Sequence, residues 1–247
     1  MSLEILGNLV VIAVNLIVGG RLLALGVERR ARPELLLGAA LSFDGIEWVF
    51  WLLGVYTPLA GTPLGGWLVI ACRTGIFIYM ALLLEFVRTV FRPDRRSARV
   101  FARCVAITIA TGLSVGTYLG DSMGFASGRI WVWLELGGAG TALGWCFLEA
   151  AGHYLKMRRR VPLGLTEPVV ANRMLLWSCY AGLGMISQTT YMAATAVAGV
   201  EGSYPFIFDG IMSASSSFGS MLIWLAFFPP LVYLRWLSRK YAAASAR

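Results

Sequence analysis

Long apolar segments alternate with short polar connections along the whole chain. Seven of these segments reach the length of about 20 residues that a helix needs to cross roughly 30 Å of hydrocarbon. They span residues 3–26, 35–57, 66–90, 98–119, 130–155, 168–198 and 205–236. The pattern therefore predicts an all-α fold, a seven-transmembrane-helix bundle that forms a single domain over residues 1–247.

Basic residues mark one side of this predicted bundle. Of the 21 Lys and Arg residues, all but Arg73 and Arg129 lie near the C-terminus or in and beside the connections after the first, third and fifth helices. The clusters read VERRARPE, RPDRRSAR, LKMRRR and LSRKY. Because short basic loops stay in the cytoplasm, we expect an N-terminus outside, a cytoplasmic C-terminus and an odd number of crossings.

The composition indicates a membrane protein. The chain has 247 residues, of which 58% are hydrophobic and 14% charged, and its mean hydropathy is +0.72. Soluble domains are far more polar than this. We therefore expect a multi-pass protein integral to the cell (inner, cytoplasmic) membrane, surrounded by the lipid bilayer.

The net charge of +8 does not predict nucleic-acid binding, because the basic residues are divided among membrane-flanking loops. Such loops suit anionic lipid head groups or a cytoplasmic or membrane partner. Gly140 and Gly144 have the GxxxG spacing that lets two helices approach closely. Packing within the chain is the simpler interpretation of this spacing, and a homo-oligomer is the alternative.

Charged side chains inside the predicted helices are the main functional candidates, because each is costly in lipid unless it is paired or hydrated. At about 1.5 Å per residue, Arg73, Glu135 and Asp209 belong to the outer third of the bilayer. We expect Arg73 to pair with Asp209, with Glu47, Asp44 or Glu135 as further candidate partners, since a lone guanidinium in hydrocarbon is unfavourable. The other members of the predicted polar pocket are Asp44, Glu47, Glu135, Tyr180, Gln188 and Thr189. A purely structural network is the alternative to a ligand or proton site.

Asp44 and Glu47 lie near mid-depth on the second predicted helix, and their i, i+3 spacing places both on one face. Two carboxylates this close repel each other in a low-dielectric site. At least one is therefore expected to hold a proton at neutral pH, unless an arginine or water lies between them. The spacing is compatible with a proton or ligand site and equally with two hydrogen-bonded structural acids.

Three residues on the cytoplasmic side are candidates for proton transfer or pH sensing. They are Glu85, Glu149 and His153, of which the last two share a helix face through their i, i+4 spacing. A simple hydrogen-bonded pair is the alternative for Glu149 and His153. The single histidine and the four cysteines show no metal-ligand spacing, so no metal site is expected.

The serine run at residues 213–217 has no histidine within reach, so no catalytic residue and no enzyme are expected. Two passages around it carry a family resemblance. LWSCY, residues 176–180, is similar to L-W-S-x-Y, and SASSSFG, residues 213–219, is similar to S-A-K-x-x-F-G. Together with Arg73 and the RIWVW of residues 129–133, these motifs resemble the microbial (type 1), retinal-binding rhodopsins. The resemblance implies a seven-helix bundle and makes Trp133 a candidate pocket wall.

Ser215 stands where that family has the lysine that binds retinal. The two lysines of the chain, Lys156 and Lys240, both belong to the predicted cytoplasmic surface, so no buried amine can form a Schiff base. A cofactor would be held without a covalent bond, with a retinoid, a carotenoid or a lipid as candidates. Small side chains around Ser215 permit close helix packing or a cavity, and close packing is the favoured interpretation.

These features predict a rhodopsin-like sensory or interaction module that works without covalent retinal. The alternative is a transporter, or a proton- or ion-conducting protein, that uses the intramembrane arginine and carboxylates. An intramembrane enzyme is the least supported class.

Overall fold

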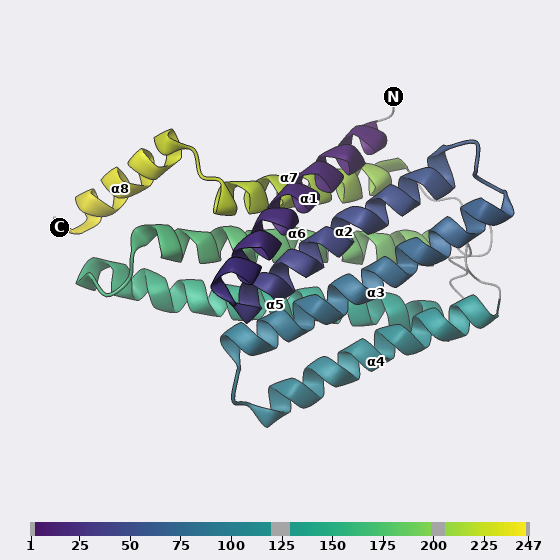
Figure 1. Cartoon of the computed structure of the whole chain (residues 1–247), viewed down its shortest axis with the longest axis horizontal. Helices are drawn as coiled ribbons and strands as arrows, with labels where there is room; N and C mark the ends of the chain where they lie inside the picture. Colours follow the sequence, from purple (N-terminus) through teal and green to yellow (C-terminus); the bar gives the residue numbers. More distant parts are fainter. Residues whose placement is uncertain (1–2, 120–128, 199–205, 246–247) are drawn as a thin grey trace.

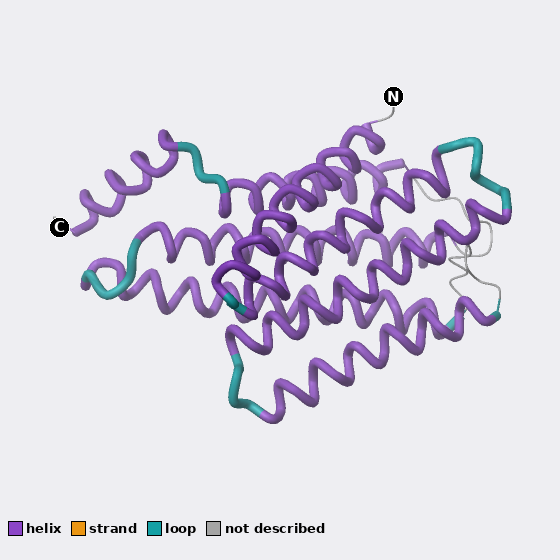
Figure 2. Tube along the Cα trace, viewed as in Figure 1, coloured by secondary structure: helices purple, strands orange, loops and turns teal. Residues whose placement is uncertain are grey.

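The computed structural model describes residues 3–119, 129–198 and 206–245, and within these ranges every regular element is a helix (Figure 2). The elements are α1 (Leu3–Arg29), α2 (Arg32–Tyr56), α3 (Pro63–Phe91), α4 (Arg96–Tyr118), α5 (Ile130–Arg160), the short 3-10 helix η1 (Val161–Leu163), α6 (Pro168–Ala198), α7 (Phe206–Phe227) and α8 (Leu231–Ser245). The predicted all-α fold is therefore confirmed.

Six of these helices are long and apolar enough to cross a membrane, namely α1, α2, α3, α4, α6 and α7. The chain is thus a polytopic membrane protein. Helix α5 has 31 residues, but Glu135 and its glycines make it less apolar than the others. The seventh crossing and the orientation of the termini stay predictions.

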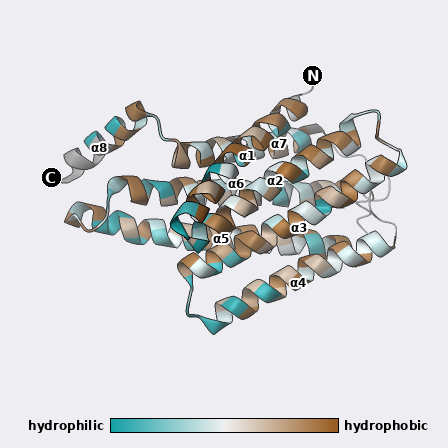
Figure 3. Ribbon diagram, in the orientation of Figure 1, coloured by the Kyte–Doolittle hydropathy of each residue, from teal (hydrophilic) through white to brown (hydrophobic). Residues whose placement is uncertain are grey.

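Helices α1 to α7 form a closed ring. Each packs against the next along the chain, α7 returns to pack against α1, and α3 also contacts α5 (Figure 1). Hydrophilic residues gather at the ends joined by the α1–α2, α3–α4 and α5–α6 connections, while the helix centres are mostly hydrophobic (Figure 3). The ring thus has a strongly polar end, and this end carries the basic connections.

Two prolines separate α7 from α8. The sequence predicted one helix over residues 205–236, but α7 ends at Phe227 and a new helix begins at Leu231. Pro229 and Pro230 lack the N–H groups that would continue the ladder, and proline disfavours helical geometry in the residue before it. Helix α8 therefore leaves the ring and contacts α6 and η1 (Figure 1).

Glycines bring α1 and α2 into backbone contact. A Cβ atom at Gly19 would lie 2.8 Å from the backbone nitrogen of Ser42, and one at Gly38 would lie 2.7 Å from that of Leu23. Without a hydrophobic force between helices in lipid, such close approach supplies the van der Waals contact that holds them together.

The two glycines of the GxxxG spacing in α5 pack against another helix of the same chain. A Cβ atom at Gly140 would lie 3.7 Å from Cγ of Gln188, and one at Gly144 would lie 3.5 Å from Sδ of Met185. Both neighbours belong to α6, so these glycines face another helix of the ring. This agrees with the simpler of the two interpretations.

Replacing Gly19 by leucine should destabilise the bundle, because the side chain would push α1 away from α2. Overpacking of this kind costs about 1–3 kcal/mol, which an unfolding titration in detergent would detect. Gly20 is the matched control, since it is exposed and a Cβ atom there meets nothing within 4 Å in the described structure. If G20L lost as much stability as G19L, close α1–α2 contact would not be what stabilises the pair.

Candidate functional site

A cavity of about 270 Å³ lies inside the ring. Its lining comes from α1, α2, α3, α5, α6 and α7. Most of the lining residues belong to the half of each helix that is farther from the basic connections, and Tyr79, Met80, Tyr180, Gly219 and Ser220 lie just past the helix midpoints. Most of the walls are aliphatic or aromatic, with polar groups at a few points, as is usual for small-molecule sites.

The structure brings most of the predicted pocket residues to this cavity. The members that line it are Asp44, Glu47, Arg73, Glu135, Tyr180, Gln188, Asp209 and Ser215. Trp133 is half-buried on α5 and is not among the lining residues. Thr189 was wrongly expected in the pocket, because its side chain is exposed and Oγ1 donates 2.8 Å to the Met185 carbonyl of its own helix.

Arg73 pairs with Glu135 across the contact between α3 and α5. The guanidinium donates to both carboxylate oxygens, with Nε 3.3 Å from Oε1, and the two side chains are only 11% and 12% exposed. The predicted pairing with Asp209 is not formed. Glu135 is favoured because α3 packs directly on α5, whereas Asp209 lines the same cavity from α7. Asp209 forms no hydrogen bond or ion pair with any of the described residues.

Small residues on α4 make room for this ion pair, a role that the sequence analysis missed. A Cβ atom at Gly112 would lie 2.7 Å from the backbone nitrogen of Glu135, and one at Gly116 would lie 3.3 Å from Nη2 of Arg73. The i, i+4 spacing of these two glycines beside an intramembrane arginine was the available signal.

Asp44 is bound by an asparagine that the sequence analysis also missed. Asn15 on α1 donates through Nδ2 to Oδ2 of Asp44, at 2.5 Å, and both side chains are buried. A second asparagine, Asn8, lies two turns earlier on α1 and lines the cavity. Two asparagines spaced by seven residues in an otherwise apolar helix were the signal for this polar face.

Glu47 enters the cavity wall where α2 meets α3. Glu47 is 6% exposed. A Cβ atom at Gly75 would lie only 2.8 Å from Cβ of Glu47, so α2 and α3 can approach this closely only because residue 75 is glycine. Within the described structure, Oε2 of Glu47 and Nδ2 of Asn8 are buried without a hydrogen-bond partner. The cavity therefore presents one acceptor and one donor that the described residues leave unsatisfied.

The serine run of α7 has two different faces. Ser213, Ser215 and Ser216 line the cavity, while a Cβ atom at Gly7 would clash with Oγ of Ser213 and lie 2.9 Å from Oγ of Ser217, so α1 packs closely on these two serines. Close packing was favoured for the whole run, and at Ser215 this expectation was wrong.

A pair of tyrosines closes the end of the cavity that faces the basic connections. The hydroxyls of Tyr79 and Tyr180 are 3.1 Å apart. Beyond them lies a layer of buried, mostly apolar side chains formed by Leu83, Leu84, Val87, Cys146, Ala150, Trp177 and Ile223. This layer separates the cavity from the charged residues of the basic end.

Aromatic rings run through this layer towards the basic end. Tyr180 stacks on Trp177 with ring centroids 5.4 Å apart, and Trp177 meets Phe86 edge to face at 5.7 Å. Phe86 contacts Phe91 at 6.5 Å, and Phe91 contacts His153 at 4.8 Å. The cavity floor and the single histidine are thus joined by one continuous row of rings.

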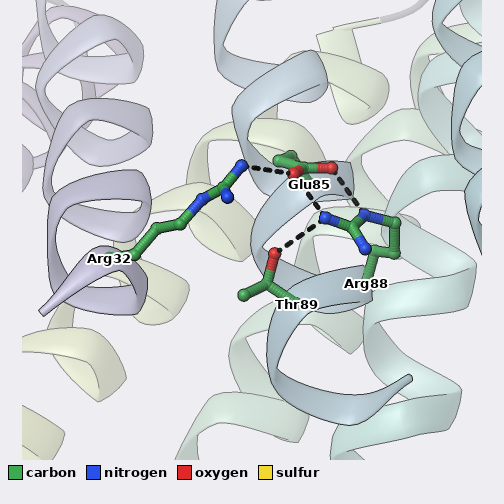
Figure 4. A network of polar contacts seen from close by, with 4 residues as sticks. All are labelled: Arg32, Glu85, Arg88 and Thr89. Carbon is green, nitrogen blue, oxygen red and sulfur yellow. Dashed lines mark hydrogen bonds and ion pairs between the residues drawn. The ribbon is translucent and has the colours of Figure 1, made fainter. Parts of the chain in front are cut away.

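Glu85 ties α3 to α2 by ion pairs (Figure 4). Its carboxylate accepts from Arg88 at 2.6 and 2.7 Å and from Arg32 at 3.0 Å, and Arg88 also donates to Thr89. The side chain of Arg32 reaches across from α2, as Figure 4 shows. Glu85 is therefore held by two arginines.

Glu149 does not pair with His153. It accepts from Nε of Arg92 at 2.9 Å and from Nε1 of Trp145 at 3.1 Å, and no hydrogen bond joins it to His153 in the described structure. A charged guanidinium makes the stronger hydrogen bond to a carboxylate. The predicted Glu149–His153 pair is thus replaced by a link between α3 and α5.

The described residues contain no group of three or more His, Cys, Asp or Glu side chains that could hold a metal ion. No protein-family model matches the chain, and neither a curated protein nor a solved structure matches it. The cavity and the charges around it are therefore the main evidence for function.

Replacing Glu135 by glutamine should destabilise the fold, because the guanidinium of Arg73 would stay buried without its carboxylate. Breaking a buried pair from one side costs about 3–5 kcal/mol, measurable by unfolding in detergent. The double variant R73Q/E135Q should lose less than the sum of the two single variants. Glu28 is exposed, so E28Q is the control and should change stability by no more than about 0.5 kcal/mol. Equal losses in E135Q and E28Q would contradict the importance of the pair.

Proposed function

We propose that this protein is a membrane sensor, rhodopsin-like in architecture, that binds a small ligand without a covalent bond. The observation that carries the proposal is the cavity of about 270 Å³ beside Ser215. It is close in size to the smallest typical ligand sites, about 300 Å³. The resemblance to microbial rhodopsins implies a chromophore at the same place, where this chain has serine instead of lysine.

The architecture supports seven crossings with the basic end in the cytoplasm. Helix α5 packs between α4 and α6 as a full member of the ring, and its 31 residues exceed the length needed to span the hydrocarbon. The basic connections all follow odd-numbered helices. By the positive-inside rule, the N-terminus then lies outside and α8 lies at the cytoplasmic surface.

A sensor needs a physical connection between its ligand and its output. The row of rings from Tyr180 to His153 provides one, because packed aromatic side chains shift together when the cavity floor moves. At its inner end lie the basic connections, suited to a cytoplasmic partner or to anionic lipid. We infer that occupancy of the cavity changes the arrangement of this basic end.

The transporter alternative is less well supported. Conduction requires a polar or hydrated path across the whole membrane. Below Tyr79 and Tyr180 the interior is mainly apolar, and the inner carboxylates Glu85 and Glu149 are held by arginines. The carboxyls of the cavity are thus separated from those of the basic end.

Filling the cavity should abolish ligand binding. Ser216→Phe places a ring at the cavity wall, whereas Ile211→Phe changes an exposed position of the same helix outside the lining. Mass spectrometry of denatured protein should find a small molecule released from the wild type and from I211F, and at least about tenfold less from S216F, as expected when no room for the ligand remains. A coloured wild-type protein would identify a retinoid or carotenoid. A folded wild type that releases nothing would contradict the proposal.

In liposomes the wild type should carry no protons, because the apolar layer interrupts any polar path. An internal pH-sensitive dye would report proton uptake under an imposed gradient. The D209N variant serves for comparison, since Asp209 lines the cavity without a partner among the described residues. Uptake by the wild type that is lost in D209N would favour the transporter instead.

A further inference from the structure

We propose that the ligand of this cavity is a small organic cation, an amine with an apolar body, whose ammonium group binds Glu47 and Asp44. The inference rests on the proposed function and adds the chemical class of the ligand. It is carried by three separate observations: the charge of the cavity, its unsatisfied polar atoms and its aromatic walls.

The cavity has an excess of acidic groups. Among the described residues that line it, Arg73 is the one cationic side chain, and it already pairs with Glu135. The carboxyls of Asp44, Glu47 and Asp209 remain without a cationic partner in the described structure. The connections over residues 120–128 and 199–205 contain no Lys or Arg that could supply one. A cation bound between Asp44 and Glu47 would therefore offset the repulsion that otherwise keeps a proton on one of them.

Unsatisfied atoms show where the cation binds. Oε2 of Glu47 is a buried acceptor without a donor among the described residues, and Asp44, within hydrogen-bonding reach of Glu47 on the same face, accepts the amide of Asn15. An ammonium group has several N–H donors, so it can bond to both carboxyls at once. Nδ2 of Asn8, which is 3% exposed and also unpartnered in the described structure, can donate to a hydroxyl or ether oxygen on the same ligand.

The walls fit an apolar body rather than a bare ion. Trp48, Trp51, Tyr180 and Tyr191 line the cavity together with aliphatic side chains. Aromatic faces attract organic cations and pack against hydrocarbon. A single metal ion would leave most of about 270 Å³ unfilled. Carboxyls lie at one wall of the cavity and aromatic side chains surround them. This arrangement suits a small amine whose apolar part is a short chain or a single ring.

The test compares probes of matched shape on the purified protein in detergent at pH 7. 2-Phenylethylamine carries the cation, 2-phenylethanol replaces it by a neutral hydroxyl, and sodium chloride, compared with buffer alone, supplies an inorganic cation. Affinity is measured by calorimetry, with the melting temperature as a second readout. The amine should bind at least about tenfold more tightly than the alcohol, because its hydrogen bonds to carboxylate are charge-assisted.

Two variants locate the binding. E47Q and D44N keep the shape of the side chains, and each should weaken amine binding by about 30-fold or more while alcohol binding changes little. E85Q is the control, because Glu85 belongs to the ion pairs of the basic end, and its affinity for the amine should equal that of the wild type. The wild-type preference for amine over alcohol tests the inference even if a variant fails to fold.

The outcomes separate this inference from the proposed function. If the alcohol binds as tightly as the amine, or if E47Q binds the amine as tightly as the wild type does, the cavity binds a ligand but the inference that this ligand is a cation is wrong. Stabilisation by sodium chloride alone would assign an inorganic ion and overturn the organic amine. If neither organic probe binds and the wild type also releases no molecule on denaturation, both the inference and the proposed function fail.

Discussion

Hydrocarbon offers no hydrogen-bond partner to a charged side chain, and this constraint decides how the interior of the ring is organised. The arginine and the carboxyls of the helix centres turn inward, where they meet one another or the cavity. Arg73 and Glu135 form the pair on which the rest depends, since it joins α3 to α5 at the side of the cavity. Without it, a buried guanidinium would open the ring to water or draw in another carboxyl.

Close helix contact and open space are both produced by small side chains. Gly19 and Gly38 let α1 and α2 touch at the backbone, and Gly112 and Gly116 on α4 accommodate the ion pair. Around Ser215, the same small size leaves a cavity because larger neighbours from other helices meet without filling it. The opposing surface thus determines whether a small residue gives contact or a void.

The ring is divided along its axis into two electrostatic compartments. One is an acidic cavity closed by Tyr79 and Tyr180. The other is a set of arginine–carboxylate pairs at the basic end, exemplified by Glu85 and Glu149. An apolar layer lies between them, crossed by a row of aromatic rings. This division favours a ligand-binding sensor over a conducting protein, because a signal can pass through packed rings where ions cannot.

The sequence alone predicted the all-α fold, the helix segments and the charged residues that line the cavity, because hydropathy and the cost of charge in lipid are properties of single positions. The predicted end of the last crossing at 236 was too late, because Pro229 and Pro230 follow the end of α7 at Phe227. The sequence did not determine which charged side chains pair with one another. That Arg73 meets Glu135 instead of Asp209, and Glu149 meets Arg92 instead of His153, follows from which helices touch and at what rotation. Only the tertiary structure decided these pairings and left space at Ser215, since contacts and voids arise from several helices together.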